Sequence, residues 1–217
     1  MSSEENRNYR NIFFLSIAAV AVMFVMSGYV WFTGKSDENN RNFLIIFAVP
    51  ILMAVTMALL PWFARLEPRQ DHLAQSRKAL TTIWAAWLMF FFIIQTVMLL
   101  NALGREPTIA TYWPILAGLV SIVMGNYLGK IRSNTIAGFR TPWTLASELS
   151  WNKTHRLGGR LLFLLGLVLI AGSLIVTGDF WAYFLIIASL LWTVVLVTYS
   201  YTIWKRDPDH TKPSLTG

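Results

Sequence analysis

The sequence predicts an all-α integral membrane protein with six transmembrane helices. Hydrophobic residues make up 55% of the 217 positions and charged residues only 13%, whereas a soluble domain carries about a quarter. The apolar residues gather in runs close to the roughly 20 residues that a helix needs to cross the hydrocarbon core. Lys and Arg lie almost entirely in alternate connections between these runs. We therefore expect a multi-pass protein of the cell (cytoplasmic) membrane, with residues 1–217 forming a single membrane domain.

Each apolar run predicts one span. The first is long enough to span and follows Glu4 and Glu5, which argues against a cleavable signal peptide. The fourth and fifth are a few residues short and can extend into their flanks. Only three residues, 177–179, separate the last two, which predicts an antiparallel hairpin, and residues 207–217 are expected to form a disordered tail. The six runs are Ile12–Thr33, Phe43–Phe63, Leu80–Leu103, Tyr112–Leu128, Leu161–Thr177 and Phe180–Trp204.

The distribution of basic residues predicts the orientation. With six spans, 15 of the 18 Lys and Arg fall on one side, and only Lys35, Arg41 and Arg105 fall on the other. Because basic loops stay in the cytoplasm, both termini are expected there, together with the loop that follows the fourth span. The net charge of +7 would favour nucleic-acid binding in a soluble protein. Topology explains it here, so no direct nucleic-acid contact is expected.

Two spans carry features that predict helix packing. The fourth has small residues at a spacing of four, which lets another backbone approach closely. This face is expected to be a packing seam, with a homodimer contact as the alternative. Pro50 interrupts the second span, and because it lacks an N–H it frees the carbonyl of Ile46 and predicts a kink. The small residues are Ala117, Ser121, Gly125 and Gly129.

Ionisable residues are missing from the middle of every predicted span. Ion-coupled transporters usually keep such a residue near the midplane, so this pattern disfavours a pump. The strongest polar side chain at mid-span is Gln95, expected to make a buried interhelical hydrogen bond, with a substrate or peptide contact as the alternative. The chain has no Cys and only three scattered His. We therefore expect no metal site, no cofactor, no catalytic residues and no enzyme activity.

The loop after the fourth span is the most informative segment. Gly138 permits a sharp turn, and Pro142 starts a helix with Thr141 or Thr144 as its cap. The following residues contain neither Gly nor Pro until Gly158, which predicts an interfacial helix of roughly three turns. Arg140 is expected to pair with Glu148, or to bind phosphate or carboxylate as a bidentate fork. The loop is either a docking surface for a cytoplasmic partner or only an anchor.

The run GNYLGKIRSNTIAGFRTPWTLASELSWNKTHRLGGRLL, from Gly125 to Leu162, resembles the signature of the SdpI family of multi-span bacterial membrane proteins. The resemblance covers a core over residues 105–206 with the signature loop at 125–160. It implies resistance to a secreted toxic peptide and binding of a cytoplasmic transcriptional repressor at the membrane. The positions carried over for partner binding or signalling are Asn126, Asn134, Gly138, Arg140, Thr141, Pro142, Trp143, Glu148 and Trp151.

One segment departs from the family pattern. Many relatives have a Pro-rich element resembling His-Trp-Asn after the first span, whereas residues 33–40 here contain neither Pro nor His. The cytoplasmic half therefore carries the resemblance. The expected function is a membrane immunity or signalling protein whose partners are lipids, an extracellular toxic peptide and a cytoplasmic repressor. A small transporter is the alternative, followed by a membrane-embedded enzyme built on Arg140, Glu148 and His155.

Overall fold

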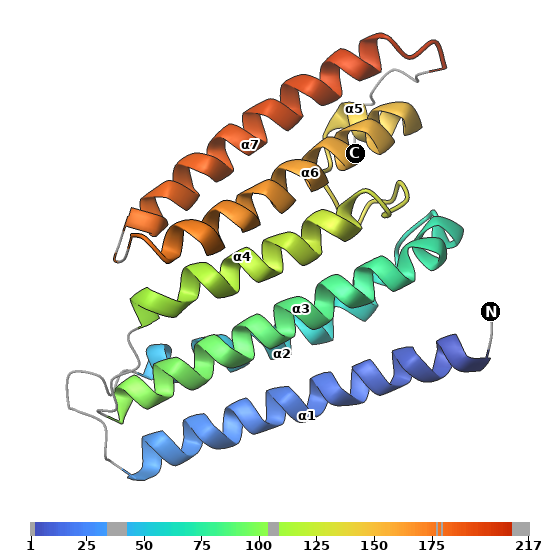
Figure 1. Cartoon of the computed structure of the whole chain (residues 1–217). Coiled ribbons are helices and arrows are strands. Elements are labelled where there is room, and N and C mark those ends of the chain that lie inside the picture. Colours follow the sequence, from blue (N-terminus) through green and yellow to red (C-terminus); the bar gives the residue numbers. More distant parts are fainter. Residues whose placement is uncertain (1–2, 34–42, 104–108, 177, 179, 210–217) are drawn as a thin grey trace. The chain divides into compact units, whose positions relative to one another are not determined.

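The fold is all-helical, as predicted. The computed structural model describes residues 3–33, 43–103, 109–176, 178 and 180–209, and every regular element in these ranges is an α-helix (Figure 1). Five helices, α1, α2, α3, α6 and α7, are long and apolar enough to cross a membrane, and α4 is a shorter apolar helix. The protein is a multi-pass membrane protein. Its helices are α1 Ser3–Thr33, α2 Phe43–Arg65, α3 Gln70–Ala102, α4 Ile109–Leu128, α5 Pro142–Ala146, α6 Glu148–Ser173 and α7 Phe180–Lys205.

Two helices begin well before their apolar runs. α3 begins at Gln70 rather than Leu80, and α6 begins at Glu148 rather than Leu161. The start of α6 is capped, because the Ser147 side chain accepts from the Ser150 N–H at 2.9 Å. At the start of α3 the Gln70 side chain donates to the Ala64 carbonyl at 2.9 Å and so serves the end of α2. Polar first turns extend both helices beyond the apolar stretch.

The predicted three-turn interfacial helix does not form as a separate element. The short helix α5 covers only Pro142–Ala146, and the rest of the predicted segment is the beginning of α6. Extended backbone at Ser147 separates the two helices. The prediction that Gly158 ends the helix fails because α6 is packed there: a Cβ atom on Gly158 would lie 2.9 Å from Leu196, and one on Gly159 would lie 2.6 Å from the Gly125 carbonyl oxygen. Packing overrides the low helix propensity of glycine.

The chain divides into two compact units, which we describe separately. The first comprises Met1–Trp62 and Trp84–Trp113, and the second comprises Phe63–Ile83 and Pro114–Gly217. The first unit is held by two apolar clusters, one around Val30, Ile46 and Leu99 and the other around Met23 and Met53. The start of α3 thus belongs with the C-terminal unit, whereas its remainder belongs with α1 and α2.

The second unit is built on a hairpin of α6 and α7, which lie side by side (Figure 1). Trp181 covers Gly172 near the turn, and at the other end Ser150 donates to the Ser200 carbonyl at 2.8 Å. The helices are therefore antiparallel, as predicted, and Gly178 between them has a φ of 94° that favours glycine. Residues 177, 179 and 210–217, including most of the predicted disordered tail, lie outside the described part of the chain, as do residues 34–42.

Helix α4 packs on α6 through glycine. The carbonyl of Gly118 approaches Gly166, and that of Gly125 approaches Gly159, so closely that an added Cβ atom at either α6 glycine would lie 2.5 to 2.6 Å away. Gly129 lies against Arg156. The contact face thus runs through residues 118, 122, 125 and 129, which follows 3.6 residues per turn. Of the predicted small residues, Gly125 and Gly129 lie on this face, whereas Ala117 and Ser121 lie beside it. A homodimer contact through Ala117 and Ser121 stays a prediction.

Candidate functional site

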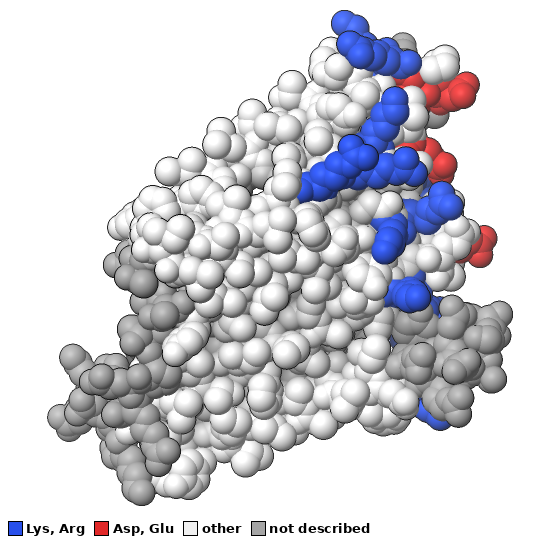
Figure 2. Space-filling model, in the orientation of Figure 1, with Lys and Arg blue, Asp and Glu red and all other residues white. Residues whose placement is uncertain are grey.

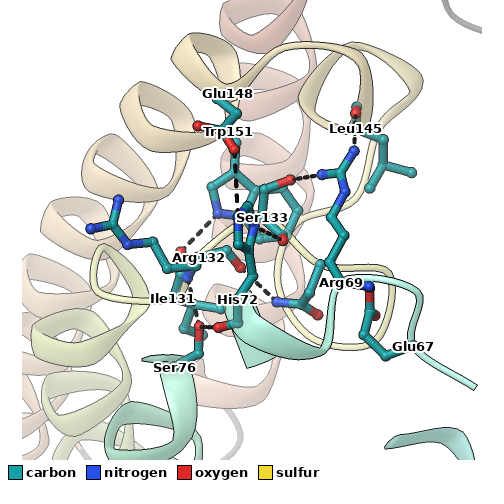
Figure 3. Close-up of polar contacts among 11 residues, drawn as sticks. Glu67, Arg69, His72, Ser76, Ile131, Arg132, Ser133, Leu145, Glu148 and Trp151 are labelled. Atoms are coloured by element: carbon teal, nitrogen blue, oxygen red, sulfur yellow. Dashed lines mark hydrogen bonds and ion pairs between the residues drawn. The ribbon is translucent and has the colours of Figure 1, made fainter. Parts of the chain in front are cut away.

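The candidate site is the connection between α4 and α5, residues 129–141, together with the elements that hold it. We call this connection the α4–α5 loop. It belongs to the second unit and is fastened to the α2–α3 turn, to the first turns of α3 and to the start of α6 (Figure 3). Its contacts join residues far apart in sequence, so the loop has a defined conformation and does not simply span the gap between two helices.

Glu67 anchors the middle of the loop. One carboxylate oxygen accepts from both the backbone N–H and the hydroxyl of Thr135, at 2.7 and 2.8 Å, and the other accepts from the Arg69 N–H at 3.0 Å. The side chain is only 2% exposed. Burial by itself raises the pKa of this carboxyl, but the hydrogen bonds from Thr135 and Arg69 outweigh it and lower the pKa below its ordinary value. Glu67 is thus held as a carboxylate.

Three more side chains from the α2–α3 region hold the start of the loop (Figure 3). Arg69 donates to the hydroxyl of Ser133 and to the carbonyl of Leu145. Nδ1 of His72 donates to the Ser133 carbonyl at 2.8 Å. Ser76 accepts from the Arg132 N–H at 2.8 Å. Backbone groups of a loop need such partners when they are removed from water, so these contacts fix the path of residues 131–135.

Asn134 and Gly138 shape the turn itself. The buried Asn134 side chain accepts from the N–H groups of Ile136 and Ala137 at 2.9 and 2.7 Å and donates to the Arg132 carbonyl. Gly138 has a φ of 122°, and a Cβ atom there would lie 2.5 Å from Nε2 of His155. Glycine is therefore required at position 138 for both conformation and space.

Trp151 and His155 form the floor under this turn. Their rings stack at 4.0 Å, and both side chains are fully buried. Trp151 donates through its indole N–H to the Ile131 carbonyl at 2.8 Å. Nε2 of His155 accepts from the Phe139 N–H at 2.9 Å, so the ring is neutral with its proton on Nδ1, which donates to the Trp151 carbonyl. The stack thus connects the start of α6 to both ends of the loop.

The segment around α5 is tied to the end of α7. Thr141, one of the two caps that the sequence allows, caps α5 in a reciprocal capping box with Thr144. The Thr141 hydroxyl lies 3.1 Å from that of Ser200, and Ser147 donates to the carboxylate of Asp207. Asp207 is buried and hydrogen-bonded, so the C-terminal tail begins as ordered chain at this residue.

The structure divides the predicted site residues by exposure. Those that face outward can contact a partner, whereas those that are buried can act only by holding the loop. Trp143 is half-buried and packs edge-to-face on Tyr201 at 5.3 Å. The exposed residues are Asn126, Gly138, Arg140, Pro142 and Glu148. The buried residues are Asn134, Thr141 and Trp151.

One expectation about this set is wrong, that Arg140 pairs with Glu148, and the Trp151 side chain lies away from the outer surface. Arg140 and Glu148 do not pair with each other: Arg140 donates to the Thr135 carbonyl, and Glu148 lies 3.9 Å from Nε2 of His72. Trp151 does not share an outer surface with Arg140, because its side chain is 0% exposed. Spacing along the chain did not reveal these partners, since the turn at Gly138 points Arg140 back along its own loop.

Sequence reasoning missed the anchoring residues of the α2–α3 region, namely Glu67, Arg69, His72 and Ser76, and their partner Ser133 in the loop. The only signal was an acidic residue in a basic connection, at Glu67-Pro68-Arg69. On the face that Figure 2 draws, Lys and Arg gather at one end, and the rest of that face carries almost no charged residues. The exposed basic residues of the loop and of α6 include Lys130, Arg132, Arg140, Lys153, Arg156 and Arg160.

The chain is similar to known proteins in two comparisons. The chain is 27% identical to the Immunity protein SdpI of Bacillus subtilis (strain 168) over 177 residues, which cover 81% of this chain and 82% of that protein. No solved structure matches the chain. Residues 130–200, which include most of the α4–α5 loop, α5, α6 and most of α7, match the SdpI/YfhL protein family. The family match at residues 130–200 includes most of the signature loop and so confirms the resemblance to the SdpI family seen there.

Proposed function

We propose that this chain is a membrane immunity protein that protects the cell against a secreted toxic peptide. The observation that carries the proposal is the similarity to the Immunity protein SdpI of Bacillus subtilis, which extends over 81% of this chain rather than the loop alone. The helices also fit the role, because a multi-pass membrane protein stands where a secreted peptide first meets the cell.

The proposed topology has six spans with both termini and the α4–α5 loop in the cytoplasm. The helix α4 serves as the sixth span, since its 20 residues reach about 30 Å at 1.5 Å per residue, the thickness of a hydrocarbon core. Six spans place 15 of the 18 Lys and Arg on the cytoplasmic side. Removing α4 from the count would split the basic residues between both sides.

In this proposal the α4–α5 loop and α5 form a docking surface for a cytoplasmic repressor. The exposed Arg140, Pro142 and half-buried Trp143 offer a cation and apolar area on neighbouring positions, a composition typical of interface anchors. The buried Trp151, Asn134 and Thr141 keep the surface in shape. Because the loop is bonded to α3, α6 and the end of α7, a shift of any of these helices would change the surface.

Protection is proposed to occur by binding or blocking, and not by pumping. A membrane transporter is the second candidate, and Gln95 would then be its first residue to test, since it is a polar group in a mid-span position. A membrane-embedded enzyme is the weakest candidate, because Glu148 is exposed while His155 is buried and used in structural hydrogen bonds. Protection that disappears when the proton gradient is collapsed, with the membrane intact, would favour the transporter.

The direct test uses Bacillus subtilis cells that lack SdpI and are challenged by a producing strain. We expect survival to be restored by the full chain, or by a hybrid in which residues 33–42 of this chain are replaced by the corresponding connection of SdpI. Protection by the hybrid alone would assign peptide recognition to that connection. If both proteins accumulate in the membrane and neither protects, the immunity proposal is rejected.

A further inference from the structure

A basic groove between α4 and α6 is not used by any of the contacts that hold the α4–α5 loop. It has a volume of about 550 Å³ and lies in the second unit. That volume is within the roughly 300–1,000 Å³ typical of ligand sites. Its floor is the backbone where the two helices meet at Gly125 and Gly159. The residues that line it are Gly125, Asn126, Gly129, Lys130, Arg156, Gly159, Arg160, Phe163 and Leu164.

The charged part of the groove has no counter-ion within the described ranges. Arg156 and Arg160 lie one turn apart on α6, both are exposed, and no carboxylate of the described chain pairs with either. Lys130 stands over the ring of Tyr127, 4.3 Å from its centroid, which leaves its charge uncompensated. Three like charges on one groove repel one another unless an anion lies between them.

The end of α4 does not supply that anion. Its C-terminus carries the equivalent of about half a negative charge. The carbonyls of Tyr127 and Leu128 there already accept hydrogen bonds from the backbone N–H groups of Lys130 and Ile131. Three full positive charges outweigh this partial charge. The groove therefore attracts a negatively charged ligand, and the amide of Asn126 adds a neutral donor on the same rim.

The rest of the groove is apolar and continues down the side of α6. Phe163 and Leu164 lie one turn beyond Arg160, and Leu164 is 56% exposed. Leu164 lies on α6, an apolar helix long enough to span a membrane, so the apolar end of the groove faces acyl chains. A ligand that is anionic at one end and apolar at the other matches the whole groove, whereas a free phosphate would match only the basic end.

We propose that the α4–α6 groove binds the phosphate of an anionic membrane phospholipid, through Lys130, Arg156 and Arg160, with an acyl chain along Phe163 and Leu164. Basic pockets between membrane helices recognise lipid headgroups in this way. The inference does not depend on the proposed immunity role. It makes the lipid a structural ligand at the α4–α6 contact, next to the loop that carries the family signature.

The test is native mass spectrometry of the purified full chain in detergent, with phosphatidylglycerol or phosphatidylcholine of matched acyl chains added. We expect selective binding of phosphatidylglycerol, reduced about fivefold for each charge removed, as in Arg156→Gln and Arg160→Gln. Arg160→Lys keeps the charge and should retain most binding. Lys153→Gln is the matched control, because Lys153 is an exposed cation of α6 that does not line the groove.

Three outcomes would overturn the proposal. Equal binding of the two lipids would mean that the charges do not select the headgroup. An equal loss in Lys153→Gln and Arg160→Gln would mean that only the overall charge matters. Displacement of phosphatidylglycerol by excess inorganic phosphate would assign the groove to a free anion and not to a lipid.

Discussion

The side-chain amide of Gln95 donates a hydrogen bond of 2.8 Å to the carbonyl of Ile46. This carbonyl lacks its helical partner because Pro50, four residues later, has no N–H. Ser27 donates to the same oxygen at 2.9 Å and accepts from Gln95. Three helices of the first unit, α1, α2 and α3, thus meet at one backbone oxygen. The mid-span glutamine and the mid-span proline are two parts of one polar contact.

The double replacement of Pro50 and Gln95 tests this coupling. Gln95→Leu alone should lower the free energy of unfolding by roughly 1 kcal/mol, the range of hydrogen bonds between membrane helices. In the Pro50→Ala background the restored N–H can serve Ile46, so the same replacement should cost less. A double-mutant cycle measured by denaturant titration gives the coupling. Strictly additive effects would show that Gln95 does not serve the gap left by Pro50.

The sequence predicted the parts of this contact without joining them. Pro50 and Gln95 stood out because each is exceptional in an apolar run, and the consequence of each follows from local chemistry. Which helix brings a donor to Ile46 depends on tertiary packing, and a hydropathy pattern contains no such information. The hairpin of α6 and α7 is different, because only residues 177–179 separate the two apolar runs and the short connection alone predicts it.

The loop shows where prediction from sequence stops. Thr141 as the cap of α5 and Gly138 as the turn were predictable, since both depend on residues within a few positions. Glu67 was not, because its partner Thr135 is 68 residues away. The burial of Trp151 was missed for a related reason. An aromatic residue next to a membrane surface has the same sequence signature whether it faces lipid or packs under a loop.

Gly138→Ala should destabilise the protein more than Gly178→Ala does. Both glycines have positive φ values, so each replacement carries a conformational cost of about 1–2 kcal/mol. At Gly178 nothing lies within 4 Å of an added Cβ, whereas at Gly138 it would meet the His155 ring. The difference in unfolding midpoint between the two variants isolates the steric effect on the Trp151–His155 stack. Equal midpoints would mean that the stack moves aside without cost.

Glu67→Gln should make the stability of the protein less dependent on pH. Because folding lowers the pKa of this carboxyl, its stabilising contribution is complete above the unfolded-state pKa and is lost as the pH falls through the lower folded-state value. Wild-type protein should therefore lose part of its stability as the pH falls below about 4, the ordinary range of a Glu carboxyl. The variant should be less stable at pH 7 by about 1–3 kcal/mol and should lose less on acidification.

Thermal unfolding at pH 7 and at about pH 3 measures both effects. Glu148→Gln is the control, since its side chain is exposed and lies 3.9 Å from His72 without a hydrogen bond. It should leave the pH dependence of the midpoint close to that of the wild type. An unchanged pH dependence in Glu67→Gln would show that Thr135 does not need a charged partner.

Arg140→Ala should separate the proposed docking surface from the fold. Arg140 is exposed, and its one contact within the described chain is the carbonyl of Thr135 on the same loop. Its removal should change the unfolding midpoint little, because replacements of exposed side chains usually stay within about 0.5 kcal/mol. Trp151→Ala, by contrast, should cost about 3–5 kcal/mol, since the ring is fully buried. The two variants therefore test contact with a partner and support of the loop separately.

The measurement that decides is recruitment of a cytoplasmic repressor to membranes, recorded beside the amount of folded protein. We expect Arg140→Ala to accumulate normally and to recruit at least tenfold less, the loss expected when about 1.4 kcal/mol of binding energy is removed. Arg132→Ala is the matched control, because that side chain is exposed on the same loop and the hydrogen bonds of Arg132 to Ser76 and Asn134 are made by its backbone. Equal recruitment by the wild type, Arg140→Ala and Arg132→Ala would mean that the loop is only an anchor for α4 and α6. Loss of recruitment in both Arg140→Ala and Arg132→Ala would mean that the repressor responds to the overall charge of the loop and not to Arg140.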